Sequence, residues 1–504
     1  MISVRNILVE QTERTRHSSK ADIHRFIEES ELKIASLESQ ISPLRDREHS
    51  CVDAPQRITS HIHSLVELRD HERSCVDALR HIISPIRTLP VELLAEIFRL
   101  TLDDPKTHIA EAYRISQICS DWRNVACGNP QLWTGPICVD LGSEKIFGRE
   151  DLYADGLEAW LARSAPLSVP VSLQLELDRT NSDPRILEIV LRVAPRFRSL
   201  RCRGVPLSFI SRLAECKLDS LEELDLGFVE SDSNAAEFPA LTMVPRLRKS
   251  SIIIEASRPH ALIPWAQLTD LTLHCDSIDV ILDILVQCAN LTSTALYTSE
   301  WYVYPATAQF TRPPLPLNHL HTLTVGFGRS KHMARFLGTV SAPALEALNL
   351  NFFGTGMHSV APLTAFLMQS PTIARLEIYG DYAPTSHELI EVLRHTVHLT
   401  HLKLTQFHKH SFDDALLNAL SCKDGVAPLV PKLHSLAMYR IMQKGGFTME
   451  ALEHMLVSRW RADPETSSGL HAVARWSHVE LCWSLRGPFF DNLQRQGLPI
   501  ELMY

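Results

Sequence analysis

The chain carries 24 histidines, and three of them, His395, His398 and His401, are spaced three residues apart, close to the spacing of zinc ligands on a helix. The surrounding pattern predicts, however, that the helix has ended before His401, which lies in a strand. No nearby cysteine or carboxylate completes a tetrahedral ligand set. We therefore expect helix-end and surface histidines here, and we predict no metal site in the chain.

The glycines of VGFGRSK, residues 325–331, superficially suggest a phosphate-binding loop. The GxxxxGK spacing of such a loop is missing, and the segment falls in a turn of the repeats that occupy this part of the chain. The sequence has no HExxH or GxSxG motif either. We therefore predict no catalytic residues and no cofactor, and we expect that the protein is not an enzyme.

Cysteine usage and charge limit the compartment and the partners. Eleven scattered cysteines with no CxxC pair fit reduced thiols in a reducing compartment. Lysine and arginine total 50 against 59 acidic residues, a net charge of -9, so nucleic acid and anionic lipid are not expected partners. The start lacks the apolar run of a secretory signal, and no window has the roughly 18 to 20 apolar residues that cross a bilayer. We expect an intracellular protein of the cytoplasm, the nucleus or both.

Residues 21–86 follow a seven-residue apolar rhythm, with Ile27, Ile34 and Ile41 at successive first positions, as in a coiled coil. The rhythm breaks before Gln56, where Pro55 favours a bend because proline cannot donate a helical hydrogen bond. Two helices folded back as a hairpin would bury the apolar stripe, and so would two dimerising chains. The sequence leaves both alternatives open.

Part of this region is nearly duplicated. RDREHSCVDA at 45–54 recurs as RDHERSCVDA at 69–78. A local duplication explains the match, and a paired redox or metal site at Cys51 and Cys75 is the weaker interpretation. We expect both thiols to be exposed.

The stretch from Ile86 to Val139 predicts a short helical module. Thr88 can cap a first helix that has Pro90 in its first turn. The apolar stripes of two helices are Leu93, Leu94, Ile97, Phe98 and Leu102, then Ile115, Ile118, Cys119, Trp122 and Val125. A module of about fifty residues buries too little surface to be robust alone, so we expect a partner to complete its core.

From about Pro184 the phrase L-x-x-L-x-L recurs at intervals of 21 to 34 residues, with LEELDL at 221–226 and LTHLKL at 399–404 among its clean examples. The phrase begins at Phe197, Leu221, Leu247, Leu268, Leu291, Leu320, Leu345, Ile373, Leu399 and Leu433. Two units are degenerate, with Ser250 and Thr294 in place of leucine. Amphipathic helical stretches lie between the phrases. This pattern predicts leucine-rich repeats, in which stacked strand–helix units bury each other's apolar faces.

On such strands, the residues that alternate with the buried leucines face the concave wall. Each of them alone is most simply a solvated strand position, but solenoids usually bind partners on this wall, so we expect the target there. Our candidate target-binding residues are Arg201, Arg203, Glu223, Asp225, Arg375, Tyr379, His401, Lys403 and Tyr439; the same alternation also selects Asp270, Thr272, His274, Asn349, Asn351 and Glu377.

The order Leu89-Pro90, Ile97-Phe98, Ile118 to Trp122 and Leu132-Trp133 resembles the F-box, the helical module that docks onto the Skp adaptor of cullin–RING ubiquitin ligases. The resemblance implies a set of adaptor-binding residues, within which Trp122 also holds the module together. The matching positions are Leu89, Pro90, Leu93, Leu94, Ile97, Phe98, Ile118, Cys119 and Trp122.

The arrangement of a heptad helix, an F-box and leucine-rich repeats is similar to that of large F-box families of mushroom-forming fungi, and so are WLARSAPLSVPVSLQLE and LVSRWR. The resemblance implies a substrate receptor of an SCF-type cullin–RING ligase, with the Skp adaptor, the cullin–RING ligase and an unknown protein target as partners. The alternative is a non-catalytic scaffold of coiled coil and repeats without a ligase role.

The predicted fold class is an α/β repeat, with an N-terminal helical coiled coil, a small all-α F-box, and a solenoid of parallel strands with helices on its outer face. The predicted segments are a flexible N-terminus (1–20), a heptad helix or hairpin (21–86), the F-box (87–140), a linker and N-terminal cap (141–183), leucine-rich repeats (184–442) and a C-terminal cap (443–504).

Overall fold

The computed structural model describes residues 4–50, 55–140, 149–174, 184–227, 229–230, 240–254, 263–298, 313–327, 330–353, 359–380, 383–407, 411–422, 429–440, 446–461, 473–482 and 488–503. The chain divides into two units, Met1–Leu132 and Trp133–Tyr504.

All described elements of the first unit are α-helices or 3₁₀ turns. Three helices precede the module that the Leu-Pro sequence predicts, and three helices of 9 to 11 residues form it. The elements are α1 (Val4–Arg14), α2 (Lys20–Ser50), α3 (Pro55–Ile82), the 3₁₀ turn η1 (Pro85–Thr88), α4 (Val91–Leu100), α5 (His108–Ile118) and α6 (Ser120–Gly128), followed by the turn η2 (Pro130–Trp133).

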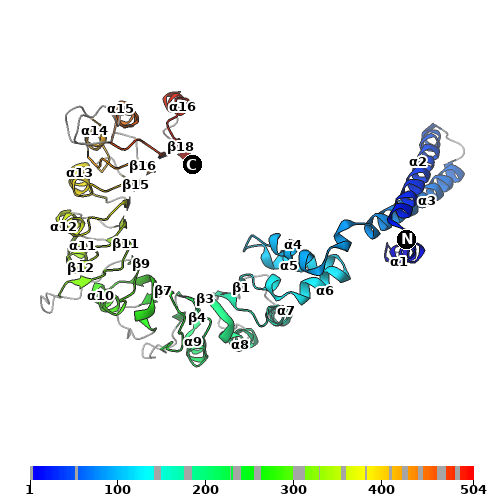
Figure 1. Ribbon diagram of the computed structural model, residues 1–504, viewed down its shortest axis with the longest axis horizontal. Helices are drawn as coiled ribbons and strands as arrows, with labels where there is room; N and C mark the ends of the chain where they lie inside the picture. Colours follow the sequence, from blue (N-terminus) through cyan, green and yellow to red (C-terminus); the bar gives the residue numbers. More distant parts are fainter. Residues whose placement is uncertain are drawn as a thin grey trace. The chain divides into compact units, whose positions relative to one another are not determined.

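Helices α2 and α3 lie side by side and form a hairpin (Figure 1). Ion pairs between Glu31 and Arg80, at 2.6 Å, and between Glu38 and Arg73 show that the two helices are antiparallel. They share a buried cluster made of Ile23, Ile27, Val76 and Leu79. The heptad stripe is therefore buried within one chain, which is the hairpin alternative of the two that the sequence left open.

Helix α1 occupies part of the segment that we predicted to be flexible. It packs on α3, where Ile7 forms a buried cluster with Cys75 and Ala78. Cys75 is therefore not the exposed thiol that we expected, and burial raises its pKa. Cys51 lies outside the described residues.

The second unit alternates strands and helices. Its main strands are β1 (Ile137–Asp140), β2 (Val169–Gln174), β3 (Phe197–Arg203), β5 (Glu223–Leu226), β7 (Lys249–Ile254), β8 (Asp270–Cys275), β9 (Ser293–Tyr297), β11 (Thr322–Phe327), β13 (Ala347–Phe352), β14 (Arg375–Tyr379), β15 (His401–Thr405), β16 (Ser435–Tyr439), β17 (His478–Cys482) and β18 (Ile500–Met503). Its helices are α7 (Glu150–Arg163), α8 (Pro184–Arg192), α9 (Leu207–Ala214), α10 (Ile278–Gln287), α11 (Ser330–Leu337), α12 (Ala361–Gln369), α13 (Ser386–Arg394), α14 (Asp414–Leu420), α15 (Met449–Trp460) and α16 (Pro488–Arg495). Short turns η3 (Ala194–Arg196) and η4 (Trp265–Gln267) and two two-stranded ladders, β4 (Val205–Pro206) with β6 (Val229–Glu230) and β10 (Leu315–Pro316) with β12 (Val340–Ser341), complete the unit.

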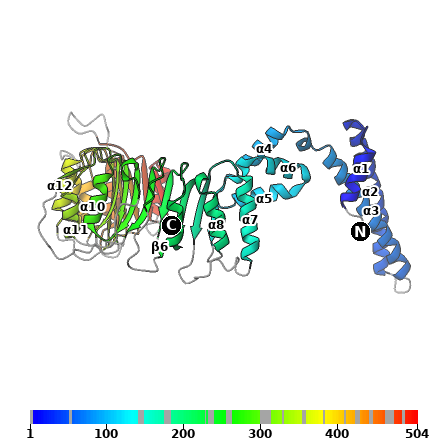
Figure 2. The same cartoon turned by 90° about the horizontal axis from the view of Figure 1, so that it is seen from below.

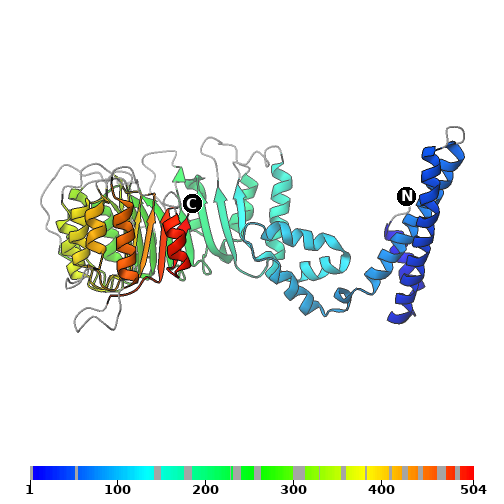
Figure 3. The same cartoon turned by 90° about the horizontal axis from the view of Figure 1, so that it is seen from above.

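The fourteen main strands form one sheet in the order of the chain, and every neighbouring pair is parallel. The strands line the inner side of an arc, with the helices on its outer side (Figure 1), and Figures 2 and 3 show the same strands from two other directions. Leu348 and Leu376 are in register on β13 and β14, and both are fully buried between sheet and helices. This is the leucine-rich-repeat solenoid that the sequence predicts.

Each of the ten recurring phrases forms a strand. The two degenerate units do so as well. Buried Thr294 on β9 donates its hydroxyl hydrogen bond to the carbonyl of Leu271 at 3.1 Å, and Ser250 is buried on β7. The sheet also extends beyond the range 184–442. Strands β1 and β2 precede it and β17 and β18 follow it, in segments whose sequences lack the leucine phrase.

A buried arginine holds the C-terminal repeats together. Arg459 on α15 is fully buried, and its guanidinium donates to backbone carbonyls only, with Nε 2.7 Å from the oxygen of Leu420. Its other nitrogens reach the carbonyls of Leu429, Val430 and Leu433. Burial lowers the pKa of Arg459 to about 10, so the group is still charged at neutral pH. Arg459 thereby ties α15 to the end of α14 and to the segment before β16.

We predict that Arg459→Met destabilises the repeat unit by about 3 kcal/mol or more, because methionine leaves buried carbonyls without their charged donor. Thermal or urea unfolding measures the change. Arg461→Met, at an exposed position two residues on, is the control and should be neutral. Equal unfolding midpoints for both variants would contradict the assignment.

Candidate functional site

Helix α4 carries two apolar stripes, and only one of them is covered. Leu94 and Phe98 point into the module and are 6% and 2% exposed, and the Phe98 ring lies 4.7 Å from the Trp122 ring of α6. Leu93 and Ile97, each one residue earlier, are 54% and 40% exposed. Because neighbouring residues of a helix point about 100° apart, the two stripes run side by side along α4.

The uncovered stripe continues to the C-terminal end of α4. The helix begins at Val91 with Pro90 at its N-cap, so the N-cap position is two residues later than we predicted. Leu100 at the end of the helix is 57% exposed and lies on this stripe, because it follows Leu93 by seven residues and Ile97 by three. Val91 is 60% exposed but points to another side of the helix, because it is two residues before Leu93. The half-buried Leu89 precedes the helix.

The junction between α5 and α6 adds one more exposed apolar side chain. Ile118 ends α5 and is 59% exposed. Cys119 caps α6, its sulfur accepting from the backbone N–H of Trp122 at 3.5 Å. Asp121 pairs with Arg87 at 3.5 Å, which brings the Leu-Pro start of the module close to this junction.

The half-buried Leu89 and the exposed residues Pro90, Leu93, Ile97, Leu100 and Ile118 define what we call the docking face. Of the residues predicted to bind an adaptor, Leu94 and Phe98 are inside the module and Trp122 packs against Phe98, so these three hold the face in place. Cys119 positions α6. Leu100, which the sequence analysis did not select, belongs to the face instead. Its spacing from Leu93 and Ile97 on one helix was the signal that could have identified it.

His108, which the sequence analysis did not select, helps to hold the helical module together. The two ring nitrogens of His108 lie 3.1 Å from the carbonyl oxygens of Leu102 and Leu132, so this side chain ties the end of the α4 segment to η2. Nothing in the spacing of His108 distinguishes it from the other histidines of the chain.

The nine candidate target-binding residues all lie on strands of the concave wall, on β3, β5, β14, β15 and β16. Arg201 donates to Asp225 at 2.8 Å, and Lys403 pairs with Glu377 at 3.5 Å. Burial, with the nearby Arg375 as a smaller cause, lowers the pKa of His401. His401 is therefore neutral at pH 7, and most charges of the wall are paired across neighbouring strands.

Each of the three regularly spaced histidines contacts a different residue. His395 pairs with Glu391 at 3.5 Å, His398 lies 2.9 Å from the ammonium of Lys432, and His401 on β15 stacks edge-on against His434. Gly326, from the glycine-rich segment, lies in β11, and Gly328 is outside the described residues.

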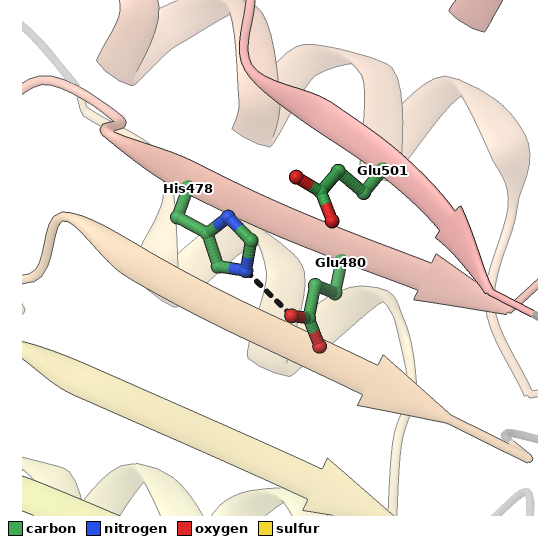
Figure 4. A group of neighbouring side chains, drawn as sticks. All are labelled: His478, Glu480 and Glu501. Atoms are coloured by element: carbon green, nitrogen blue, oxygen red, sulfur yellow. Dashed lines mark hydrogen bonds and ion pairs between the residues drawn. The ribbon is translucent and has the colours of Figure 1, made fainter. Parts of the chain in front are cut away.

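One group of potential metal ligands was not anticipated. His478 and Glu480 on β17 and Glu501 on β18 bring their ligand atoms within 4.8 Å of one another (Figure 4). His478 Nε2 lies 2.6 Å from a carboxylate oxygen of Glu480, and Glu501 is exposed on the neighbouring strand. A divalent cation would fit these donors, but the ion pair already accounts for the approach of the first two. We therefore treat the group as a charged strand face.

One protein family matches the helical module that carries the docking face. Residues 86–138 match the F-box-like family. None of the curated proteins matches the chain.

Three solved structures are similar at a distance. The Rad7–Elc1 complex in yeast has a TM-score of 0.38 at 13% identity, over 75% of this chain and 95% of that one. The TLR13–ssRNA13 complex has 0.26 at 13%, over 56% and 43%, and the leucine-rich-repeat protein LegL7 from Legionella pneumophila has 0.28 at 12%, over 64% and 96%. At these scores the similarities say nothing of what the chain binds. The chain thus combines an F-box-like helical module with a solenoid of leucine-rich-repeat type.

Among the described residues, no helix is both long and apolar enough to cross a membrane.

The two stripes of α4 predict different responses to truncation. Phe98→Ala should destabilise the module by about 3 to 5 kcal/mol, because it leaves a cavity beside Trp122. Ile97→Ala, on the uncovered stripe, should change its stability by less than about 1 kcal/mol. Hydrogen exchange of the amides from Val91 to Gly128 measures both, and similar losses of protection in the two variants would contradict this division.

Proposed function

We propose that the chain is the substrate-recognition subunit of an SCF-type cullin–RING ubiquitin ligase. Its docking face binds a Skp adaptor, and the concave wall of its repeats binds the target protein. It contributes no catalytic residues and acts by holding the target near a ubiquitin-loaded enzyme. The observation that carries the proposal is the uncovered apolar stripe of α4 within a segment that matches the F-box-like family.

The energetics favour a permanent partner for this stripe. Leu93, Leu100 and Ile118 are each more than half exposed, and Ile97 is 40% exposed. Burying the remaining apolar surface of such a side chain stabilises a complex by roughly 1 kcal/mol, so the face as a whole supports tight binding. A soluble protein rarely gathers so many exposed apolar side chains on one short helix without a binding role.

The finer features of the resemblance belong to this proposal. The hairpin, the F-box-like module and the repeats follow one another as in the F-box families of mushroom-forming fungi, and the proposed ligase role implies a location in the cytoplasm or nucleus. The rival scaffold assembles through a coiled coil. The hairpin weakens that rival, because α2 and α3 already bury their apolar stripe against each other. A dimer through this region stays a prediction.

We predict that the purified chain binds a purified Skp adaptor and that Leu93→Asp together with Ile97→Asp weakens binding at least a hundredfold. Each change places a charge where the complex would bury an apolar side chain. Isothermal titration calorimetry measures the affinity.

Leu32→Asp is a matched control, because Leu32 is a 72%-exposed leucine of α2 outside the docking face. This variant should bind the adaptor as the wild type does. A wild-type chain that ignores the adaptor would overturn the ligase assignment, and equal losses in both variants would overturn the position of the face.

A further inference from the structure

One row of concave positions, near the carboxyl ends of the strands, is rich in aromatic and apolar side chains. Strand register aligns one position per strand across eight neighbouring strands, from β7 to β16. We call this the aromatic row: Ile253, His274, Tyr297, Gly326, Asn351, Tyr379, Thr405 and Tyr439.

Phe353, the residue after β13, completes the row at its glycine. A Cβ on Gly326 would collide with the ring carbons of Phe353, so the ring occupies the place that a side chain would take on β11. The rings of His274 and Tyr297 stack at 4.8 Å. The row thus presents aromatic rings on β8, β9, β14 and β16 and at the end of β13, with Ile253, Asn351 and Thr405 on the strands between or beside them.

The aromatic row is accessible. Ile253, Phe353 and Tyr379 are 45%, 43% and 40% exposed. In the described part of the second unit, the other exposed large apolar side chains lie on helices or in loops, namely Leu152, Met243, Val286, Met368 and Val397. Exposed apolar side chains gathered on one line of a sheet are typical of a binding surface.

The centre of the same wall is free of charged side chains. Strands β9, β11 and β13 contribute Ser293, Ala295, Tyr297, Thr322, Thr324, Gly326, Ala347, Asn349 and Asn351 to the concave face. Burial lowers the pKa of His274 on the adjacent β8, so its ring is neutral at pH 7. A charged partner group buried over these strands would lose its hydration without gaining a counterion.

We propose that the aromatic row binds an extended, uncharged segment of the target polypeptide that is rich in aliphatic or aromatic side chains. The inference rests on the target-receptor role proposed above and specifies its partner. Eight strands at a spacing of about 4.8 Å span roughly 34 Å, which an extended segment of about ten residues covers.

Single-stranded nucleic acid also stacks on aromatic rows, but such sites need unpaired basic groups along the groove. Here Lys403 pairs with Glu377 at 3.5 Å, and Lys249 pairs with Glu223 at 3.4 Å. The pairing of charges therefore favours a peptide.

The test is a selection of random twelve-residue peptides, displayed on phage, against the immobilised full chain. Enriched peptides should carry aliphatic and aromatic residues and no Asp, Glu, Lys or Arg in their central positions. A synthetic copy of the most enriched peptide should bind Tyr379→Ala at least tenfold more weakly than the wild type. Enrichment of centrally charged peptides, no enrichment, or no effect of Tyr379→Ala would overturn the proposal.

Gly326→Ala probes the row without removing any ring. The added methyl group displaces the exposed Phe353 ring, which can move without disturbing the core, so the fold is kept and peptide binding should fall several-fold. Gly156→Ala on α7 is the matched control, because a Cβ there meets nothing within 4 Å, and it should bind as the wild type does. Unchanged binding in Gly326→Ala would overturn the role of the Phe353 ring in the row.

Two further measurements separate the possible failures. A twenty-nucleotide oligouridine that binds the wild type but not Tyr379→Ala would assign the row to nucleic acid and overturn the proposal. Adaptor binding is measured on the same preparations, and Tyr379→Ala should leave it unchanged. A chain that binds the adaptor but enriches no uncharged peptides loses this inference alone, whereas peptide binding without adaptor binding removes the ligase assignment.

Discussion

The second unit depends on one constraint: no strand–helix repeat can bury its own apolar face. Leu348, Leu376 and Leu402 illustrate the solution, since they are in register on three neighbouring strands and each is covered only because the next repeat is present. These leucines form the core between sheet and helices, so the side chains that alternate with them on the concave face do not pack in the core. The concave wall can therefore carry almost any side chain, which is why a recognition surface can vary there without disturbing the fold.

In the first unit, one apolar surface of the F-box-like module remains uncovered. The covered stripe of α4 meets Trp122, but the stripe of Leu93 and Ile97 has no neighbouring element of the described chain over it. In the repeats an incomplete core is completed by the next copy along the chain. In the F-box-like module, we propose that another protein completes the core, and this difference separates a structural surface from a docking surface.

Sequence reasoning succeeded where one pattern implied one structure. The leucine phrase specifies both the strand and its buried face, and even Thr294 in place of leucine did not hide β9. Strands β1, β2, β17 and β18 were missed because segments such as Ile137–Asp140 show alternation without the leading leucine. Their place in the sheet comes from backbone pairing with the adjacent strands, which their own short sequences do not specify. The sequence could not predict which stripe of α4 is covered, for a similar reason. An apolar stripe that includes both Leu93 and Leu94 does not indicate which of the two side chains packs against its own chain.

The concave face shows the same limit. Alternation correctly selected Tyr379 and Tyr439 as wall residues, but the aromatic row became visible only when register aligned eight strands. Phe353 lies one residue beyond the end of β13, and its place above Gly326 depends on a close approach between β11 and the end of β13 that no local pattern encodes.

The carbonyl network around Arg459 has a consequence for how this part of the protein tolerates change. The Arg459 guanidinium donates hydrogen bonds only to main-chain oxygens. It therefore does not require particular residue types at the positions that supply them, because every amino acid has a carbonyl group. Substitutions at Leu429 or Val430 that preserve the backbone path keep the network, whereas no other side chain at position 459 reproduces its planar fork of donors. The sequences of the last repeats can thus change while Arg459 itself is kept.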